Sequence, residues 1–295
     1  MLAALDRSGN GAWLRGVEER KAAEAVFHDA KVDRRGGRRG SADLPEAQRG
    51  NKRFYSTVAK SRAYTYRWIE RQAPGRVVLD YACGQGELAL RAARAGAELA
   101  IGVDISRTSI ANARANAAED GLEGNSFFFQ GDCEATGLPD ECADLLICSG
   151  MLHHLNVKNA FPEMRRVLRP GGVCLAVEAL DYNPLVKLYR RLTPKLRTAW
   201  EQEHILSHRE LRLARRYFEV REVRYWHLAS IAAAGLRGTP LFRAALAVGN
   251  SIDAVLLRVP PIAYLAWQFS FELHKPAAPA GATLTGPTTA QERAA

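Results

Sequence analysis

The chain has 295 residues, of which 47% are apolar and 25% are charged, and its formal net charge is +9. This composition is typical of a globular protein with room for a substantial core. It excludes a collagen-like repeat, global disorder and a disulfide scaffold. The positive charge favours an anionic partner or a membrane surface without indicating a fold.

The spacing of the cysteines and the hydropathy of the chain predict its cellular location and whether it binds a metal. The five cysteines form no CxxC pair and have no histidine at zinc-ligand spacing, so we expect reduced thiols, a cytoplasmic protein and no metal site. The sequence shows neither a cleavable signal peptide nor a run of about 18 uncharged apolar residues, so we expect no spanning helix.

The two ends differ in composition from the middle. Residues 17–28 are rich in Ala, Glu and Lys and predict a short helix. Residues 31–53 carry eight Lys and Arg against three acids, which is typical of a basic linker. Residues 276–295 contain almost no large apolar side chain and predict a disordered tail. We therefore expect residues 1–53 to form a helix and linker that can act as a lid on one domain, residues 54–275.

Short apolar runs alternate with helix-forming segments in the first part of this domain. Strands are predicted over residues 77–81, 99–103, 126–130, 143–148 and 173–177. Helices are predicted over residues 87–95, 106–119 and 161–168, with Pro162 in the first turn of the last one. Strands without a polar face, separated by helices, predict a parallel sheet in an α/β sandwich.

The second part of the domain has helical insertions and two further strands. Residues 184–218 predict helices, and residues 220–230 and 264–274 predict antiparallel strands that close the sheet. Between those strands, residues 231–262 are far longer than a hairpin loop. They mix apolar side chains with three arginines, which is typical of an interfacial helix. We expect a cover over an apolar substrate, with peripheral membrane contact or a subunit interface as alternatives.

Acidic residues follow each of the first three predicted strands. Asp80 precedes Gly84 and Gly86 before a helix, where the backbone can approach a ligand and the helix N-terminus presents free N–H groups. Asp104 ends the second strand, where a carboxylate accepts both hydroxyls of a ribose. Asp132 follows the third strand and can accept from an exocyclic adenine amine. These residues predict one nucleoside site at the carboxyl edge of the sheet.

Further motifs follow in a fixed order: Leu138-Pro139, the strand ending before Ser149, Leu152-His153-His154-Leu155, and Leu168-Arg169-Pro170-Gly171-Gly172. With the three acids, they resemble class I S-adenosylmethionine-dependent methyltransferases, in the branch that acts on quinones, lipids and natural products. The resemblance covers residues 77–178 strongly. It implies a Rossmann-like α/β fold with strand order 3-2-1-4-5, seven mostly parallel strands, an antiparallel last strand, and helices on both faces.

The same resemblance implies S-adenosylmethionine as cofactor, with S-adenosylhomocysteine as product. It assigns to the cofactor Asp80, Ala82, Gly84, Gly86, Asp104, Ile105, Asp132, Cys133, Ser149, Tyr55 and Tyr64. Ala82 stands where the family usually has Gly, and we expect a slightly tighter turn and retained binding. Tyr55 and Tyr64 belong to the segment that covers the cofactor in related enzymes. The alternative for Tyr64 is an amphipathic helix packed on the sheet.

The acceptor side is less specific. Methyl transfer is an in-line displacement, so positioning supplies much of the rate, and a hydroxyl acceptor also needs a base. His153 and His154 follow the fourth strand and Glu178 ends the neighbouring fifth. We predict His153 as the base with Glu178 or His154 as its partner. The alternative is a histidine pair that only shapes the pocket. We favour O-methylation of a small, apolar molecule.

Other function classes fit less well. Nucleic-acid binding is not favoured, because the fourth strand is not followed by [DN]-P-P-[YFW], no Pro-Cys occurs, and the basic segments lack interleaved aromatic residues. Glu201 and Glu203 match the glutamate pair of protein-arginine methyltransferases poorly. An RNA or protein methyltransferase and a non-catalytic binding subunit stay open as alternatives. The sequence identifies neither the acceptor nor the oligomeric state.

Overall fold

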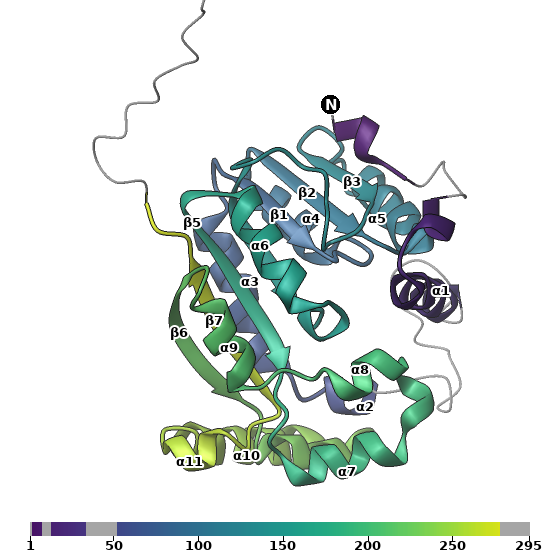
Figure 1. The fold of residues 1–295 in the computed structure, drawn as a ribbon. Helices are drawn as coiled ribbons and strands as arrows, with labels where there is room; N and C mark the ends of the chain where they lie inside the picture. The colour runs from purple at the N-terminus through teal and green to yellow at the C-terminus, as the bar shows by residue number, and fades with distance from the viewer. Residues whose placement is uncertain (1, 8–12, 34–51, 278–295) are drawn as a thin grey trace, which may run out of the picture.

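A seven-stranded sheet forms the centre of the computed structural model, which describes residues 2–7, 13–33 and 52–277 (Figure 1). The strand order is β3-β2-β1-β4-β5-β7-β6. The strands are β1 (Val77–Tyr81), β2 (Leu99–Asp104), β3 (Ser126–Gln130), β4 (Ala143–Ser149), β5 (Leu168–Ala179), β6 (Glu219–Trp226) and β7 (Gln268–His274). β1 to β5 pair in parallel, and β7 runs antiparallel to both of its neighbours. The predicted order and the antiparallel last strand are confirmed.

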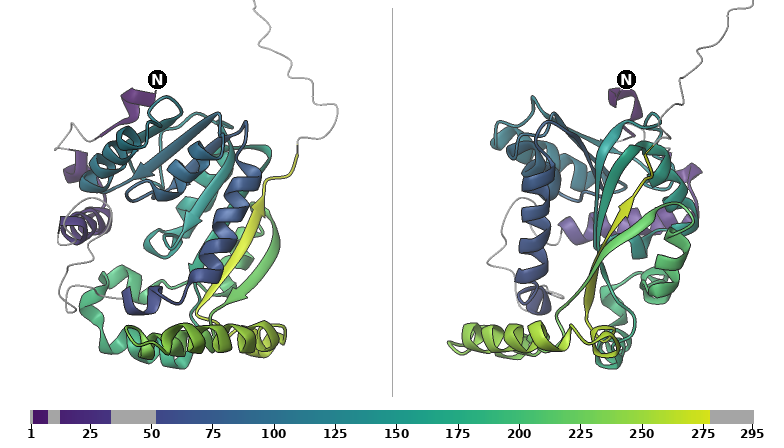
Figure 2. Two further views of the ribbon diagram at one scale, coloured as in Figure 1. Left: turned by 180° about the vertical axis from the view of Figure 1, so that it is seen from behind. Right: turned by 90° about the vertical axis from the view of Figure 1, so that its left-hand side faces the viewer.

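Helices cover both faces of the sheet. In the part of the chain described here they are α1 (Glu19–Asp33), α2 (Lys52–Tyr55), α3 (Ala59–Gln72), α4 (Glu87–Arg94), α5 (Arg107–Glu119), α6 (Val157–Val167), α7 (Pro184–Leu192), α8 (Ala199–Glu203), α9 (His208–Ala214), α10 (Phe242–Leu256) and α11 (Pro260–Ala263). Helices α3, α4 and α5 pack on one face, and α6 and α9 pack on the other (Figure 2).

Alternating side chains of the central strands supply the two cores. In β1, Val78 joins the core under α3 and α4, whereas Leu79 joins the core under α6. All five residues of β1 are buried. A strand that is covered on both faces favours apolar residues on both, and this explains why β1 is apolar at every position except Asp80.

Several predicted boundaries differ from the structure, and β5 begins at Leu168, five residues before its predicted start. Helix α6 begins at Val157, so Pro162 is its sixth residue and does not lie in the first turn. The side chain of Asn156 caps this helix by accepting from the N–H of Lys158, and this cap moves the start upstream. The last two strands are shorter than predicted, because the chain leaves the sheet after Trp226 and returns at Gln268.

The segment between β6 and β7 is helical. It contains the 3-10 helix η6 (Ser230–Leu236), α10 and α11. Helices α7, α10 and α11 lie together at one end of the molecule in all three views, beyond the carboxyl end of β5 (Figures 1 and 2). The described residues contain no helix of the length and apolarity that crossing a bilayer requires. Most of the predicted basic linker and the predicted tail lie outside the described residues.

Candidate active site

The turn from β1 into α4 carries three residues in the left-handed region. The φ angles are +57° at Ala82, +52° at Gly84 and +81° at Gly86. A Cβ added at Gly84 would have no atom within 4 Å, whereas one at Gly86 would lie 2.8 Å from the ring of Phe128. Gly84 therefore leaves the backbone open to a ligand. Gly86 is required for packing of the turn against β3.

We expect Ala82→Gly to stabilise the fold. A left-handed φ costs an L-residue about 1–2 kcal/mol, and the extra flexibility of glycine in the unfolded chain offsets about 0.4–1 kcal/mol. The net gain in unfolding free energy should be about 0.5–1 kcal/mol. It is measured by urea unfolding beside Ala117→Gly, at a buried position inside α5, which should destabilise the protein. Destabilisation by both changes would contradict the strain at Ala82.

Asp104 ties the glycine turn to the next helix. One carboxylate oxygen accepts from the N–H of Gly84 and the other from the N–H of Ser106, both at 2.8 Å. Each carboxylate oxygen has a second lone pair, so two further hydrogen bonds can be accepted. The following Ile105 is half-buried. Burial raises the pKa of the Asp104 carboxyl, against the effect of these two N–H groups.

The Asp80 side chain, at the end of β1, caps the N-terminus of α4. Its carboxylate accepts from the N–H of Ala89 at 3.0 Å, which fills an orphan donor of the first helical turn. Burial raises the pKa of this carboxyl to about 7, and the nearby Asp104 adds to the shift although the Ala89 N–H opposes it. A buried carboxylate without a cationic partner is costly, which makes Asp80 a group that a bound cation would stabilise.

Ionisation of Asp80 predicts a pH-dependent stability. Its pKa is higher in the folded than in the unfolded state, so the wild type should lose stability as pH rises from about 4 to about 7. Asp80→Asn keeps an oxygen for Ala89 but does not titrate. Its unfolding free energy relative to wild type should therefore rise by about 2 kcal/mol between about pH 5 and about pH 8, measured in urea. Parallel pH profiles would show that Asp80 is ionised throughout.

Helix α1 lies over Asp132, the acid that follows the third strand. Lys21 Nζ lies 2.7 Å from Asp132 Oδ2, and Arg20 lies 2.6 Å from Glu134. Farther along the helix, Asp29 accepts from the hydroxyl of Ser106 at 2.5 Å. The N-terminal helix is therefore held against the carboxyl ends of β2 and β3. The sequence indicated a lid here but not which residues hold it, because these partners are over 70 residues away along the chain.

The remaining predicted cofactor residues occupy three different environments. Cys133 is buried, and its carbonyl accepts from the hydroxyl of Tyr81. Ser149 is exposed at the end of β4. The ring of Tyr64 packs on Trp226 of β6, 5.2 Å between centroids. This contact fits the alternative of a helix packed on the sheet, and the assignment of Tyr64 to the cofactor stays a prediction.

His153 and Glu178 form a buried pair beside the nucleoside site. The Nδ1 of His153 lies 2.7 Å from one oxygen of Glu178. The other oxygen accepts from the N–H groups of Met151 and Leu152, both at 2.8 Å. Glu178 is fully buried, and because Met151 and Leu152 donate to its first oxygen, the contact with the second oxygen gives Nδ1 of His153 the donor role. The Nε2 of His153 is then an acceptor, and it lies 3.9 Å from Glu201.

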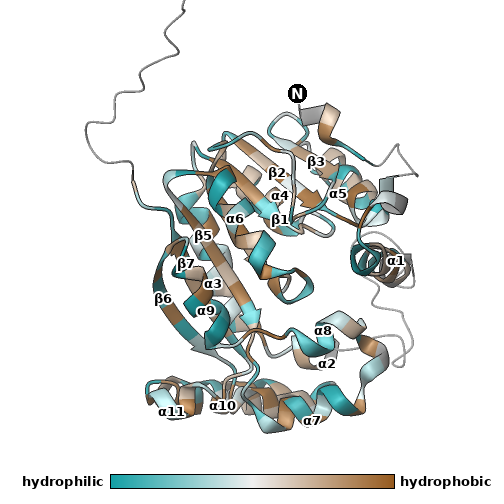
Figure 3. Cartoon of the chain, in the orientation of Figure 1, coloured by the Kyte–Doolittle hydropathy of each residue, from teal (hydrophilic) through white to brown (hydrophobic). Residues whose placement is uncertain are grey.

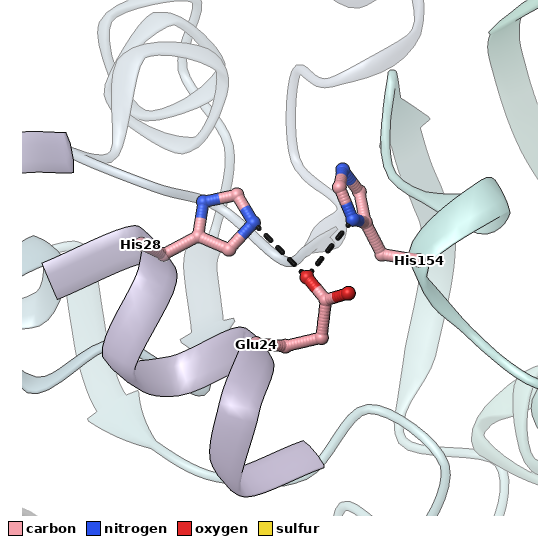
Figure 4. Close-up of side chains that lie close together, drawn as sticks. All are labelled: Glu24, His28 and His154. Atoms are coloured by element: carbon pink, nitrogen blue, oxygen red, sulfur yellow. Dashed lines mark hydrogen bonds and ion pairs between the residues drawn. The ribbon is translucent and has the colours of Figure 1, made fainter. Parts of the chain in front are cut away.

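His154 has a different partner, on α1. Its Nδ1 lies 3.0 Å from Glu24, and His28 lies 3.5 Å from the same oxygen (Figure 4). Against the effect of burial, the hydrogen bonds from His154 and His28 hold the pKa of Glu24 well below its usual range. Burial lowers the pKa of His154, so its neutral ring donates to Glu24. The ligand atoms of these three residues lie within 4.8 Å of one another, close enough for a metal ion. Their hydrogen bonds explain the arrangement without one.

A cavity of about 730 Å³ opens next to His153. Most of its lining is apolar or aromatic: Phe54, Tyr55, Ala179, Leu185, Val186, Tyr189, Ile205, Leu228, Ile231, Ala234 and Trp267. Its charged lining residues are Arg190, Arg197 and Glu201. Tyr55 therefore lines this cavity, beyond β5, whereas Asp104 and Asp132 lie at β2 and β3. Sequence reasoning missed Arg197 and Trp267, because no local motif marks a residue that only the folded chain brings to a cavity.

Comparison with known proteins identifies the central domain. Residues 78–172 match the family model described as a methyltransferase domain. The ribosomal protein L11 methyltransferase of Pseudomonas paraeruginosa strain PA7 is 35% identical over 109 residues, which cover 36% of this chain and 35% of that protein. The ubiquinone/menaquinone biosynthesis C-methyltransferase UbiE of Rhodopseudomonas palustris strain HaA2 is 35% identical over 117 residues, covering 38% and 46%. Residues 78–172 of the chain are therefore similar to a methyltransferase domain.

The fold of this methyltransferase domain is shared more widely than its sequence. Geranyl diphosphate C-methyltransferase from Streptomyces coelicolor A3(2), solved with Mg²⁺, geranyl diphosphate and S-adenosyl-L-homocysteine, aligns with a TM-score of 0.58. The alignment is 15% identical and covers 89% of this chain and 99% of that one. This likeness shows the fold alone. The chain spans less than half the length of the two curated relatives that it matches.

Proposed function

We propose that this protein is an S-adenosylmethionine-dependent methyltransferase that acts on a small, largely apolar acceptor, with O-methylation favoured. The open backbone at Gly84 and the spare lone pairs of Asp104 fit a nucleoside with a free ribose. Asp132 already pairs with Lys21, and its remaining lone pairs can accept from the adenine amine. Helix α1 acts as the lid. When bound, S-adenosylmethionine supplies a methyl group already activated on a sulfonium.

The observation that carries the acceptor proposal is the His153–Glu178 pair in the wall of an apolar cavity. The cavity walls hold the acceptor and exclude water. The bound cofactor would supply the methyl group and leave as S-adenosylhomocysteine, and Nε2 of His153 would accept the proton of the acceptor hydroxyl. Glu178 stabilises the imidazolium that forms. A base positioned in this way contributes about 10²–10⁴ in rate.

A protein acceptor is the second candidate, since one relative is named for methylating a ribosomal protein. That match covers only 36% of this chain. A cavity lined by aromatic and aliphatic side chains suits a small molecule better than a polar lysine in water. A non-catalytic binding subunit is the third candidate, and the next experiment separates it from the other two.

The test is calorimetric titration with S-adenosylhomocysteine, followed by methyl uptake from labelled S-adenosylmethionine into phenols, quinols and fatty acids. The variant Gly235→Leu tests the cavity separately from the cofactor site. Gly235 lines the cavity, and a Cβ there would meet no atom within 4 Å, so the larger side chain can fill the cavity. We expect this variant to retain cofactor affinity and to lose transfer to bulky acceptors. Cofactor binding without any methyl uptake would favour the binding subunit, and no cofactor binding would overturn the proposal.

A further inference from the structure

Helix α10 is apolar but contributes little to the core. Of its residues only Gly249 and Asp253 are buried. Asp253 holds the helix to η6 by accepting from the N–H of Ala229 at 2.6 Å. A Cβ at Gly249 would lie 2.6 Å from the backbone of Ser230, so the two helices touch there. Asp253 and Gly249 thus hold α10 against η6, and the large apolar side chains of α10 do not pack in the core.

The exposed large apolar residues of α10 form one stripe. They are Val248, Ile252 and Val255, at spacings that fall on one face of a helix with 3.6 residues per turn. Leu241, just before the helix, and Val259, beyond its end, are exposed as well. Val248 is 61% exposed and Val255 is 64% exposed. Amphipathic helices of globular proteins turn such a stripe inward, and this one faces out.

Helix α7 repeats the pattern at the same end of the molecule. Leu185, Leu188 and Leu192 lie on one of its faces and are exposed, the first by 75% and the last by 73%. Brown segments mark both helices in Figure 3. Leu185 also lines the cavity, as does Ile231 of η6, the helix on which α10 rests. The stripes of α7 and α10, called the apolar end below, therefore border the proposed acceptor site.

The charge of this end is mainly positive. Residues 184–200 and 228–267 contain eight Lys and Arg and a single acid, Asp253, whose carboxylate is buried against η6. Just outside these ranges, Asp181 pairs with Lys187 and Arg190, and Glu201 pairs with Arg197. Arg243 and Arg258 are exposed near the two ends of α10. An apolar stripe flanked by exposed arginines is the pattern of a helix that lies in the surface of an anionic bilayer.

We propose that the apolar end docks on an anionic lipid bilayer and that the acceptor enters the cavity from the membrane. The docking stands on its own, whereas the entry route rests on the proposed methyl transfer. A second copy of the chain fits this end less well, because two like-charged surfaces would face each other. Phosphate headgroups would instead pair with Arg243 and Arg258 while Val248 and Ile252 enter the acyl boundary.

Co-sedimentation of the full chain with vesicles tests the docking. Vesicles of phosphatidylcholine alone are compared with vesicles that also contain phosphatidylglycerol, at low and high salt. We expect binding to the anionic vesicles that weakens at least about tenfold without phosphatidylglycerol and falls with salt. Val248→Glu with Ile252→Glu should weaken binding by more than about tenfold, and Arg243→Glu with Arg258→Glu should remove the dependence on anionic lipid. Val26→Glu, an exposed valine on α1, is the control and should not change binding.

Cofactor titration and light scattering on the same samples separate the outcomes. Intact S-adenosylhomocysteine binding with no vesicle binding would overturn the docking and leave the methyltransferase proposal standing. If the protein is a dimer and the double variant Val248→Glu with Ile252→Glu dissociates it, a second copy covers this end. That result would also overturn the docking. The docking is supported if the stripe variant weakens vesicle binding, the arginine variant removes its dependence on anionic lipid, and Val26→Glu changes neither. This holds whether or not the cofactor binds.

Discussion

Glu178→Gln is expected to lower kcat for methyl transfer by about 10²–10⁴-fold while leaving the Kd for S-adenosylhomocysteine unchanged. Glu178 accepts from Met151, Leu152 and His153 at once, and a glutamine side chain has only one acceptor oxygen. If that oxygen keeps the two backbone N–H groups, the amide N–H₂ faces Nδ1 of His153. The ring then carries its proton on Nε2, and the base that faces the cavity is lost.

Glu163→Gln is the matched control for this change. Glu163 is also a buried glutamate, and it accepts from the N–H of Thr136 at 2.8 Å, but it lies on α6 away from the cavity. We expect it to cost about 1–3 kcal/mol of stability without changing kcat. A second readout is added imidazole, which should restore part of the activity of His153→Ala. Equal loss of cofactor affinity and rate in Glu178→Gln would show that the pair only supports the fold.

The nucleoside half of the site could be predicted because its signals are local. A strand that is buried on both faces favours a nearly continuous apolar run, and the turn that follows needs residues that accept a positive φ. Both features can be read from residues 77–87 without knowledge of the rest of the chain. The strand order followed from the resemblance, and the sheet pairing confirms it.

The acceptor half could not be predicted to the same depth. Its cavity is assembled from α2, the end of β5, α7, η6 and Trp267, which are far apart in the sequence. The partner of His154 is Glu24, 130 residues upstream, and no periodicity signals such a pair. The contact of Tyr64 with Trp226 likewise joins α3 to β6 across more than 150 residues of the sequence.

Asp104→Asn is expected to raise the Kd for S-adenosylhomocysteine by about 10²–10³-fold. The carboxylate already accepts from Gly84 and Ser106, so ribose hydroxyls would bind to the remaining lone pairs of a charged group, each worth about 1.5–3 kcal/mol. An asparagine turns its amide N–H₂ toward one of these backbone donors and distorts the turn at Gly84. Because burial raises the pKa of Asp104, wild-type affinity should also weaken as pH falls, and the variant should lose that dependence.

Asp144→Asn separates loss of the ribose contact from loss of fold. Asp144 likewise accepts from a backbone N–H, that of Val77 at 2.8 Å, and it pairs with Arg169, but it lies at the amino end of β4, the opposite edge of the sheet. Both variants should lose comparable stability in urea, and only Asp104→Asn should lose calorimetric affinity. If a folded Asp104→Asn protein keeps its affinity for S-adenosylhomocysteine, the ribose does not bind at the end of β2. That result would leave Asp104 as a brace between the glycine turn and α5, since its two backbone hydrogen bonds do not require a ligand.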